Sequence, residues 1–568
     1  MKRFFLLIFV IFSLFFFVSC GGDENALQDE GGETDGEGAS LSLRAVREGA
    51  SGCSDSMGFD CLSQDIAAIS FQVRSKGETV FQKSIPRNEL KNLKEIKGIK
   101  DAENATLLVS IFLGSDVSSP KWQGKATGLK FEKGKTTKVT LLLYPLAGQP
   151  KELAMPEGLT IPRFGHSTTV LPDGRVLVAG GFTSCGANGK CIAMESVEII
   201  DMESGEVKTL APMAEKRAMH TVVTLNDGSV LFIGGVQALN AMQQTNDEKF
   251  AKFPILPYSQ TGAVAAIEHY MPSYPRYNMK ENNLGIQIAN TTEIMPDEIP
   301  FMTLQSIFVK QTLSETGEND APIEVFLVGG VDADGQPSKK TYKFTITDST
   351  LDDGTVSIGT VTEFAESSAQ MLLPALAYAD GSIVAAGGRQ VDSETAASII
   401  SETSSVDFGD AKDNIFFTQS IAADGNLYTF GCYELESGNI VESNKNKIRK
   451  WDISGKEISV ANDTLMTRGN NIIFPEAVYD SQKDRFIIIG GTNAADIYQV
   501  INATDLDVYG NDISNSPSHV MTDSRIMPKA AVVPAGVIVD RPVLVITGGT
   551  SALNSSGSAA KTIKINVL

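Results

Sequence analysis

Among the residues that could do chemistry, the six cysteines of this 568-residue chain have the clearest pattern. Cys185 and Cys191 flank the stretch GANGK, and Cys53 and Cys61 flank SDSMGFD. Two sulfurs at such spacings can form a disulfide or supply half of a tetrahedral metal site. No His or third Cys lies near either pair, so we predict two short-loop disulfides and no metal site. Disulfides of this kind suit an oxidising compartment.

The histidines and acidic residues do not form a recognisable catalytic set. His166 and His220 each stand three residues after an Arg, in two stretches of similar sequence, which indicates a structural role. Acidic residues are abundant, but no spacing singles out a pair of carboxylates for hydrolysis. The loop Val331–Gln336 contains Asp-x-Asp-Gly but not the rest of an oxygen-ligand loop. It therefore predicts a turn rather than a calcium site.

The elements that must position these residues are contained in a repeat. The stretch Ile161–Val236 holds PRFGHSTTVLPDGRVLVAGG and then KRAMHTVVTLNDGSVLFIGG. Asp-Gly between two β-rich runs predicts a tight hairpin, and the closing glycines allow a sharp turn or close packing. Related runs end at Gly329–Gly330, Gly387–Gly388, Gly431, Gly490–Gly491 and Gly548–Gly549. Each unit predicts a small antiparallel sheet that must stack on further copies, giving an all-β fold.

The repeat spacing resembles that of kelch repeats, which have a period of roughly 50 residues. Over about Lys151–Leu568 the chain resembles a bacterial kelch-type β-propeller and is similar to the central domain of galactose oxidase. This resemblance implies seven blades, with six as the alternative. The last copy ends at Lys561–Val567, where a third strand belongs. The segment Lys151–Leu159 resembles Lys208–Met213, the outer strand of the first copy, so we expect residues 151–159 to complete the last blade.

Galactose oxidase activity would imply a copper ion held by two His and two Tyr, with one Tyr cross-linked to Cys. The chain has no Tyr-His pair where that family carries it, and His269-Tyr270 has the reverse order. The box typical of sialidase propellers is also absent. We therefore predict no copper, no other cofactor and no catalytic residues.

Three arginines recur at the starts of repeats, namely Arg163, Arg217 and Arg525. In one interpretation they surround the mouth of the axial channel and bind an anionic ligand. In the other, each one bonds carbonyls or acids of the neighbouring blade. The second interpretation is favoured, because the repeat itself explains the recurrence.

The N-terminal part of the chain predicts export and attachment to a membrane. Residues 1–19 have two basic residues, an apolar run and then small residues, as a secretory signal does. The following Cys20-Gly-Gly resembles the bacterial lipoprotein signal, which implies a lipid on Cys20. Residues 20–40 are acidic and Gly-rich and predict a flexible tether. Residues 41–148 alternate like short strands and predict a small β-sandwich, immunoglobulin-like or transthyretin-like.

Charge limits the partners. The formal net charge of −21 argues against nucleic acid, because a phosphate backbone requires a basic surface. The lipid signal implies a bacterial cell-envelope protein at the outer membrane, on its periplasmic face or at the cell surface.

One repeat is much longer than the others, since the interval from Gly234 to Gly329 far exceeds that from Gly180 to Gly234. If Asn290–Met295 is the third strand of this repeat, an insertion occupies about residues 237–289. Long loops over rigid folds often bind ligands, and Tyr and Arg are enriched at binding hot spots. The insertion carries His269, Tyr270, Tyr274, Arg276 and Tyr277. These residues either form part of a recognition surface or pack their aromatic rings on the adjacent blade.

The loop between Cys185 and Cys191 is the corresponding connection of the preceding repeat, so we expect both on one face. We predict a non-catalytic module that binds a protein or a glycan there. The alternative is an extracytoplasmic carbohydrate-active or oxidising enzyme on the same fold.

Overall fold

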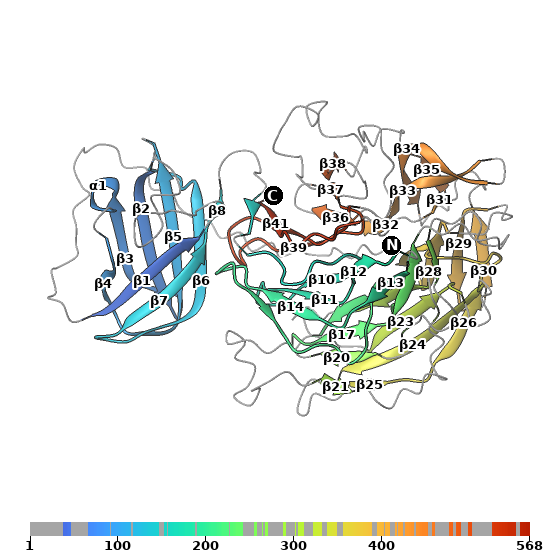
Figure 1. The fold of residues 1–568 in the computed structure, drawn as a ribbon, viewed down its shortest axis with the longest axis horizontal. Coiled ribbons are helices and arrows are strands. Elements are labelled where there is room, and N and C mark those ends of the chain that lie inside the picture. Colours follow the sequence, from blue (N-terminus) through green and yellow to red (C-terminus); the bar gives the residue numbers. More distant parts are fainter. Residues whose placement is uncertain are drawn as a thin grey trace, which may run out of the picture.

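The protein is described by a computed structural model (Figure 1). It describes residues 38–46, 66–90, 93–114, 117–146, 153–155, 157–187, 190–225, 228–241, 255–257, 264, 267–270, 288–290, 302, 305–311, 322–331, 338–348, 356–388, 395–402, 404–408, 415–416, 419–423, 426–436, 439–452, 457–460, 476–480, 484–489, 498–502, 525–551 and 557–567. The expected signal, Cys20 and the expected tether up to residue 37 lie outside these ranges.

The all-β prediction is confirmed. Over the described ranges the chain forms ten small sheets, and its helical content is the single turn α1 (Arg87–Leu90). No helix in these ranges has the length and apolar character needed to cross a membrane.

Two sheets form an N-terminal unit around one hydrophobic core. The larger sheet has the order β3-β2-β5-β6-β8 and the smaller one the order β4-β1-β7, in which β1 and β7 are parallel. Alternate residues of each face are buried, for example Phe71 and Val73 on one sheet and Leu41 and Leu43 on the other. The strands are β1 (Ala39–Val46), β2 (Ile66–Ser75), β3 (Glu78–Pro86), β4 (Ile96–Ile99), β5 (Ala102–Leu113), β6 (Trp122–Phe131), β7 (Thr136–Leu142) and β8 (Tyr144–Pro145).

The rest of the described chain forms eight sheets. Seven of them follow one another in sequence order, one for each predicted repeat, and the eighth is formed by the connections within the first two. The first has β10 (Ser167–Val170), β11 (Val176–Ala179), β14 (Val197–Ile200) and β15 (Val207–Thr209), and the second has β16 (Thr221–Thr224), β17 (Val230–Ile233), β20 (Glu268–Tyr270) and β21 (Ile288–Asn290). The third has β22 (Ser306–Lys310), β23 (Ile323–Val328), β24 (Lys340–Asp348), β25 (Val356–Ile358) and β26 (Thr362–Glu366), and the fourth has β27 (Ala375–Ala379), β28 (Ser382–Ala386), β29 (Ala397–Ser401) and β30 (Ser404–Phe408).

The last three sheets follow the same plan. The fifth has β31 (Ile415–Phe416), β32 (Gln419–Ala423), β33 (Asn426–Glu436), β34 (Asn439–Asp452) and β35 (Glu457–Val460), and the sixth has β36 (Glu476–Asp480), β37 (Arg485–Ile489) and β38 (Tyr498–Asn502). The seventh has β39 (Lys529–Val533), β40 (Val543–Thr547) and β41 (Lys564–Val567), and its outer strand is β9 (Leu153–Ala154), which comes from before the first sheet.

Each sheet packs on the next, and the seventh packs on the first. The reason is visible in β11, whose residues are apolar on both faces. Val176 and Val178 share a core with the seventh sheet, whereas Leu177 and Ala179 share a core with the second. A strand covered on both faces has a continuous apolar run rather than an alternating one. In Figure 1 the colours accordingly run from teal through yellow to red, and the red strands lie beside the first sheet.

The glycine pairs allow this close packing. Gly180 and Gly181 end β11 with φ of 64° and 95°. The N–H of Gly181 donates to the carbonyl of Arg217, which precedes the next sheet, at 2.9 Å. A Cβ on Gly180 would lie 2.3 Å from the same carbonyl oxygen. Any other residue is therefore excluded both by backbone conformation and by space.

The interpretation of the long repeat is wrong. Its third strand is β20, which pairs with β17, and its fourth strand is β21. Residues 268–270 and 288–290 thus belong to the sheet itself and not to an insertion. Asn290 is the last residue of β21, so Asn290–Met295 is not the third strand.

We expect Gly180→Ala to lower the free energy of unfolding by about 3 kcal/mol or more, since it combines a left-handed φ with a steric clash. The control is Gly381→Ala, at φ 80° with no atom within 4 Å of the added Cβ. It should cost only about 1–2 kcal/mol. Urea denaturation measures both, and equal losses would contradict the packing argument.

Candidate functional site

The side chains of Arg163 and Arg217 each bind groups of the sheet that directly follows them in the chain. The guanidinium of Arg163 is buried, forms an ion pair with Glu198 of β14 and donates to the carbonyl of Gly180 at 2.9 Å. Arg217 repeats this arrangement with Glu268 of β20 at 2.6 Å. Burial lowers the pKa of both arginines, and the nearby carboxylates partly offset that shift.

The two glutamates were missed at the sequence level. Besides its Arg, Glu198 accepts hydrogen bonds from the N–H groups of Thr160 and Ile161 at 2.6 and 3.2 Å. Glu268 likewise binds the N–H groups of residues 214 and 215. Each glutamate therefore fixes the segment that enters its sheet. A sequence signal for these glutamates does exist: an apolar residue followed by Glu at the start of the third strand of a repeat, as in Val197-Glu198.

Arg525 is also buried, and its Nη2 donates to the carbonyl of Thr562 at 3.0 Å. The interpretation that Arg163, Arg217 and Arg525 face an anionic ligand is therefore wrong. They do bind acids and carbonyls, as the other interpretation holds. However, these partners lie in the same sheet rather than in the neighbouring one.

The repeated histidines connect adjacent sheets. The Nε2 atom of His220, which directly precedes β16 of the second sheet, hydrogen-bonds with Oγ of Ser167 in the first at 2.9 Å. The Nε2 atom of His166, which directly precedes β10 of the first sheet, hydrogen-bonds with Oγ1 of Thr547 in the seventh at 2.8 Å. Burial is the main reason that the pKa of each histidine lies well below its ordinary value, so both are neutral.

The expected recognition residues His269 and Tyr270 are not on a surface loop. Both are buried in β20, where His269 hydrogen-bonds with Ser229 at 2.7 Å and the Tyr270 hydroxyl donates to the carbonyl of Ala211 at 2.7 Å. Their assignment as binding residues is therefore wrong, because a strand of the second sheet uses them in its core. Tyr274, Arg276 and Tyr277 lie outside the described residues.

A separate four-stranded sheet, here called the accessory sheet, is formed by two connections. It contains β12 (Phe182–Cys185) and β13 (Lys190–Ala193), which lie between β11 and β14 of the first sheet. It also contains β18 (Ala238–Ala241) and β19 (Ile255–Pro257), which lie between β17 and β20 of the second. Pairing of β13 with β18 joins the two connections. The expectation that they share a face is thereby confirmed.

The accessory sheet has a buried face and an exposed one. Phe182, Cys191 and Leu239 pack on a cluster that includes the residues directly after the repeated arginines, such as Phe164 and Ile526. The other face includes Ile192, which is 55% exposed. Within the described ranges it is one of three exposed large apolar side chains, together with Val117 and Val406.

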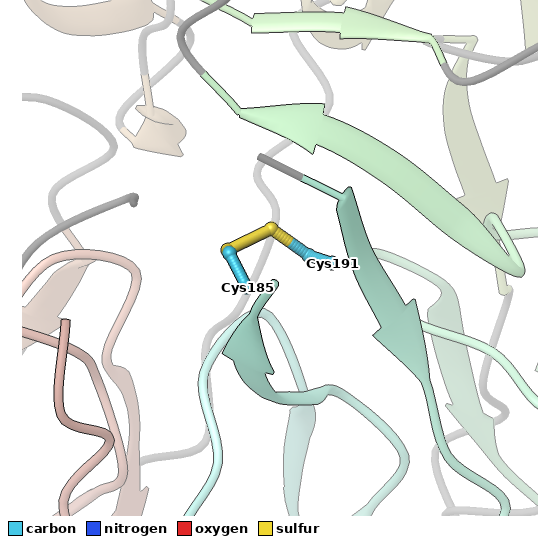
Figure 2. The surroundings of a disulfide bond; sticks show 2 residues. All are labelled: Cys185 and Cys191. Carbon is cyan, nitrogen blue, oxygen red and sulfur yellow. A yellow bond between two sulfur atoms is a disulfide. The ribbon is translucent and has the colours of Figure 1, made fainter. Parts of the chain in front are cut away.

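The predicted disulfide between Cys185 and Cys191 is confirmed, with Cα atoms 4.1 Å apart (Figure 2). It joins β12 to β13 and so holds together the hairpin that carries Ile192. The other predicted pair, Cys53 and Cys61, lies outside the described residues.

Near the starts of the inner strands, Glu476 of β36 forms an ion pair with Lys529 of β39 at 2.9 Å. Burial raises the pKa of Glu476, and the attraction of Lys529 opposes this. The pair connects the sixth sheet to the seventh. In the described ranges, no three His, Cys, Asp or Glu residues are grouped so as to hold a metal ion.

No protein-family model and no curated protein matches the chain. A solved structure titled "Structure of YjhT" is similar with a TM-score of 0.35 and 13% sequence identity, over 63% of this chain and 94% of that one. This similarity is too weak to establish a family or a function.

We expect Glu198→Ala to lower the free energy of unfolding by about 3–5 kcal/mol, because it leaves a buried guanidinium without its counter-charge. The control is Glu195→Ala, which removes an exposed ion pair with Lys216 (N···O 3.8 Å). Its effect should stay within about 1 kcal/mol. Urea denaturation compares the two variants, and a small loss for both would contradict a structural role for Glu198.

We expect stability to fall as the pH is lowered below about 6.5, the ordinary pKa of histidine. The unfolded chain then binds protons that buried His166 and His220 do not take up. Each histidine contributes a slope of about 1.4 kcal/mol per pH unit until its folded-state pKa is reached. The variant His220→Gln should lose the slope contributed by one histidine, about 1.4 kcal/mol per pH unit. All other titrating groups are the same in the variant and in the wild-type protein. Thermal or urea unfolding across this range measures the slope, and an unchanged slope in the variant would refute the assignment.

Proposed function

We propose that the chain is a lipid-anchored protein of the bacterial cell envelope, attached through Cys20 at the outer membrane. In this proposal the seven sheets form a kelch-type β-propeller, and the N-terminal unit is a β-sandwich. The packing of the seventh sheet on the first and the outer strand supplied by β9 support a closed ring.

The proposed role is non-catalytic binding of a protein or a glycan through the exposed face of the accessory sheet. The observation that carries this proposal is the accessory sheet itself. It departs from the repeat, is cross-linked by a disulfide and exposes Ile192 on its solvent side. A hairpin that a cross-link holds rigid before binding loses little conformational entropy when it binds.

The repeated polar residues support the same proposal because they are used inside the protein. Arg163, Arg217, His166 and His220 all bind groups within the protein, and their side chains are buried. The repeat therefore builds the framework, and binding is assigned to the connections, where functional residues commonly occur.

We expect Ile192→Asp to weaken partner binding at least about tenfold, because loss of a desolvated hot-spot contact costs about 2 kcal/mol or more and each 1.4 kcal/mol is about tenfold in affinity. The mature protein would be immobilised and presented with detergent-solubilised envelope proteins and, separately, with a glycan array. Val406→Asp is the matched control, since Val406 is 42% exposed on β30 of the fourth sheet.

Retention that is lost in Ile192→Asp and kept in Val406→Asp would support the proposed site, and the arm that shows it would identify the partner class. Equal retention by both variants would place binding elsewhere. No retention in either arm would contradict the proposed role.

A further inference from the structure

Within the described residues, the N-terminal unit contacts the first and the last of the seven sheets. Tyr144 of β8 lies in one hydrophobic cluster with Val176 and Met202 of the first repeat and with Val543 and Ile565 of the seventh sheet. The cluster therefore has members from three parts of the chain that are far apart in sequence.

Specific hydrogen bonds hold the N-terminal unit to the first sheet. The carboxylate of Glu203, just after β14, is buried and accepts hydrogen bonds from the N–H and Oγ1 of Thr127, both at 2.9 Å. The carbonyl of Glu203 accepts the N–H of Leu142 at 2.7 Å. The Tyr144 hydroxyl donates to the carbonyl of Met202.

A second set of hydrogen bonds holds the same unit to the seventh sheet. The Nζ of Lys125 donates to the carbonyls of Gly536 and Val537, at 3.1 and 2.8 Å, in the turn between β39 and β40. In the other direction, Arg541 donates to the carbonyl of Leu146 at 2.9 Å. Thr127 and Lys125 both belong to β6, so one strand contacts both sheets.

The junction between the first and seventh sheets is unlike the other junctions between sheets. Neighbours elsewhere follow each other in the chain, whereas these two are brought together from opposite ends of the repeat region. Ordering such a distant contact has a larger entropic cost than ordering a local one. Within the repeats, this closure is held by the β9 pairs Lys564↔Ala154 and Ile565↔Leu153 and by the hydrogen bonds of His166 with Thr547 and of Gly549 with Arg163.

We propose that the N-terminal unit stabilises the junction between the first and seventh sheets, acting as a brace across the closure of the ring. The proposal rests on the contacts above and is independent of the proposed binding partner.

The test compares two double variants of the mature chain by hydrogen–deuterium exchange. Lys125→Met/Glu203→Ala removes one hydrogen-bonding side chain at each of the two contacts, Glu203 at the first sheet and Lys125 at the seventh. The control, Lys130→Met/Glu206→Ala, makes the same substitutions in the same strand and the same turn, at positions whose ion pairs are exposed.

In the first double variant, amides of β9, β10–β11, β14–β15 and β39–β41 should exchange about tenfold faster, as expected when buried hydrogen bonds are lost. Amides of β27–β30 in the fourth sheet should be unchanged, and the control should resemble the wild type throughout. Acceleration confined to the N-terminal unit, acceleration of all seven sheets alike, or no acceleration would overturn the proposal.

If the double variant does not fold, Tyr144→Phe provides the same test, since it removes a single donor to Met202. It should produce the same pattern with a smaller amplitude. Exchange in the first and seventh sheets that matches the wild type would overturn the proposal.

Discussion

The backbone hydrogen bond from the second glycine of one sheet to the carbonyl that precedes the next sheet determines how the repeats stack. It joins Gly181 to Arg217, Gly330 to Met371 and Gly549 to Arg163, at 2.8–2.9 Å. Because both partners are backbone groups, the carbonyl side does not require arginine, and the fourth repeat has methionine there. The glycine side has no such freedom, since a Cβ on the preceding glycine would meet the same carbonyl.

The parts of the fold that the sequence predicted are those with local signals. Asp380 and Gly381 have φ of 47° and 80°, and this is the turn that Asp-Gly between apolar runs indicates. The Cys185–Cys191 pair was predictable because few residues separate the two cysteines. The similarity of residues 151–159 to an outer strand anticipated the pairing of β9 with β41, which is long-range but carried by a repeated pattern.

The rest depends on contacts that no local pattern encodes. β20 has three residues, which is too short to show the alternation of polar and apolar residues that indicates a strand. The longer stretch Asn290–Met295 resembles a strand more closely. The partners of Arg163 and Arg217 were assigned to neighbouring sheets because spacing alone does not reveal Glu198 and Glu268. The accessory sheet requires β13 and β18 to pair across two different repeats, and neither strand has a distinctive sequence.

The first sheet connects the two non-repeated parts of the molecule. The connection that forms β12 and β13 ends at Val197, the first residue of β14, whereas Glu203 follows the last residue of the same strand. The accessory sheet and the N-terminal unit therefore contact opposite ends of β14. A buried strand is among the stiffest elements of a protein. The first sheet consequently holds the N-terminal unit and the accessory sheet in a fixed arrangement relative to each other.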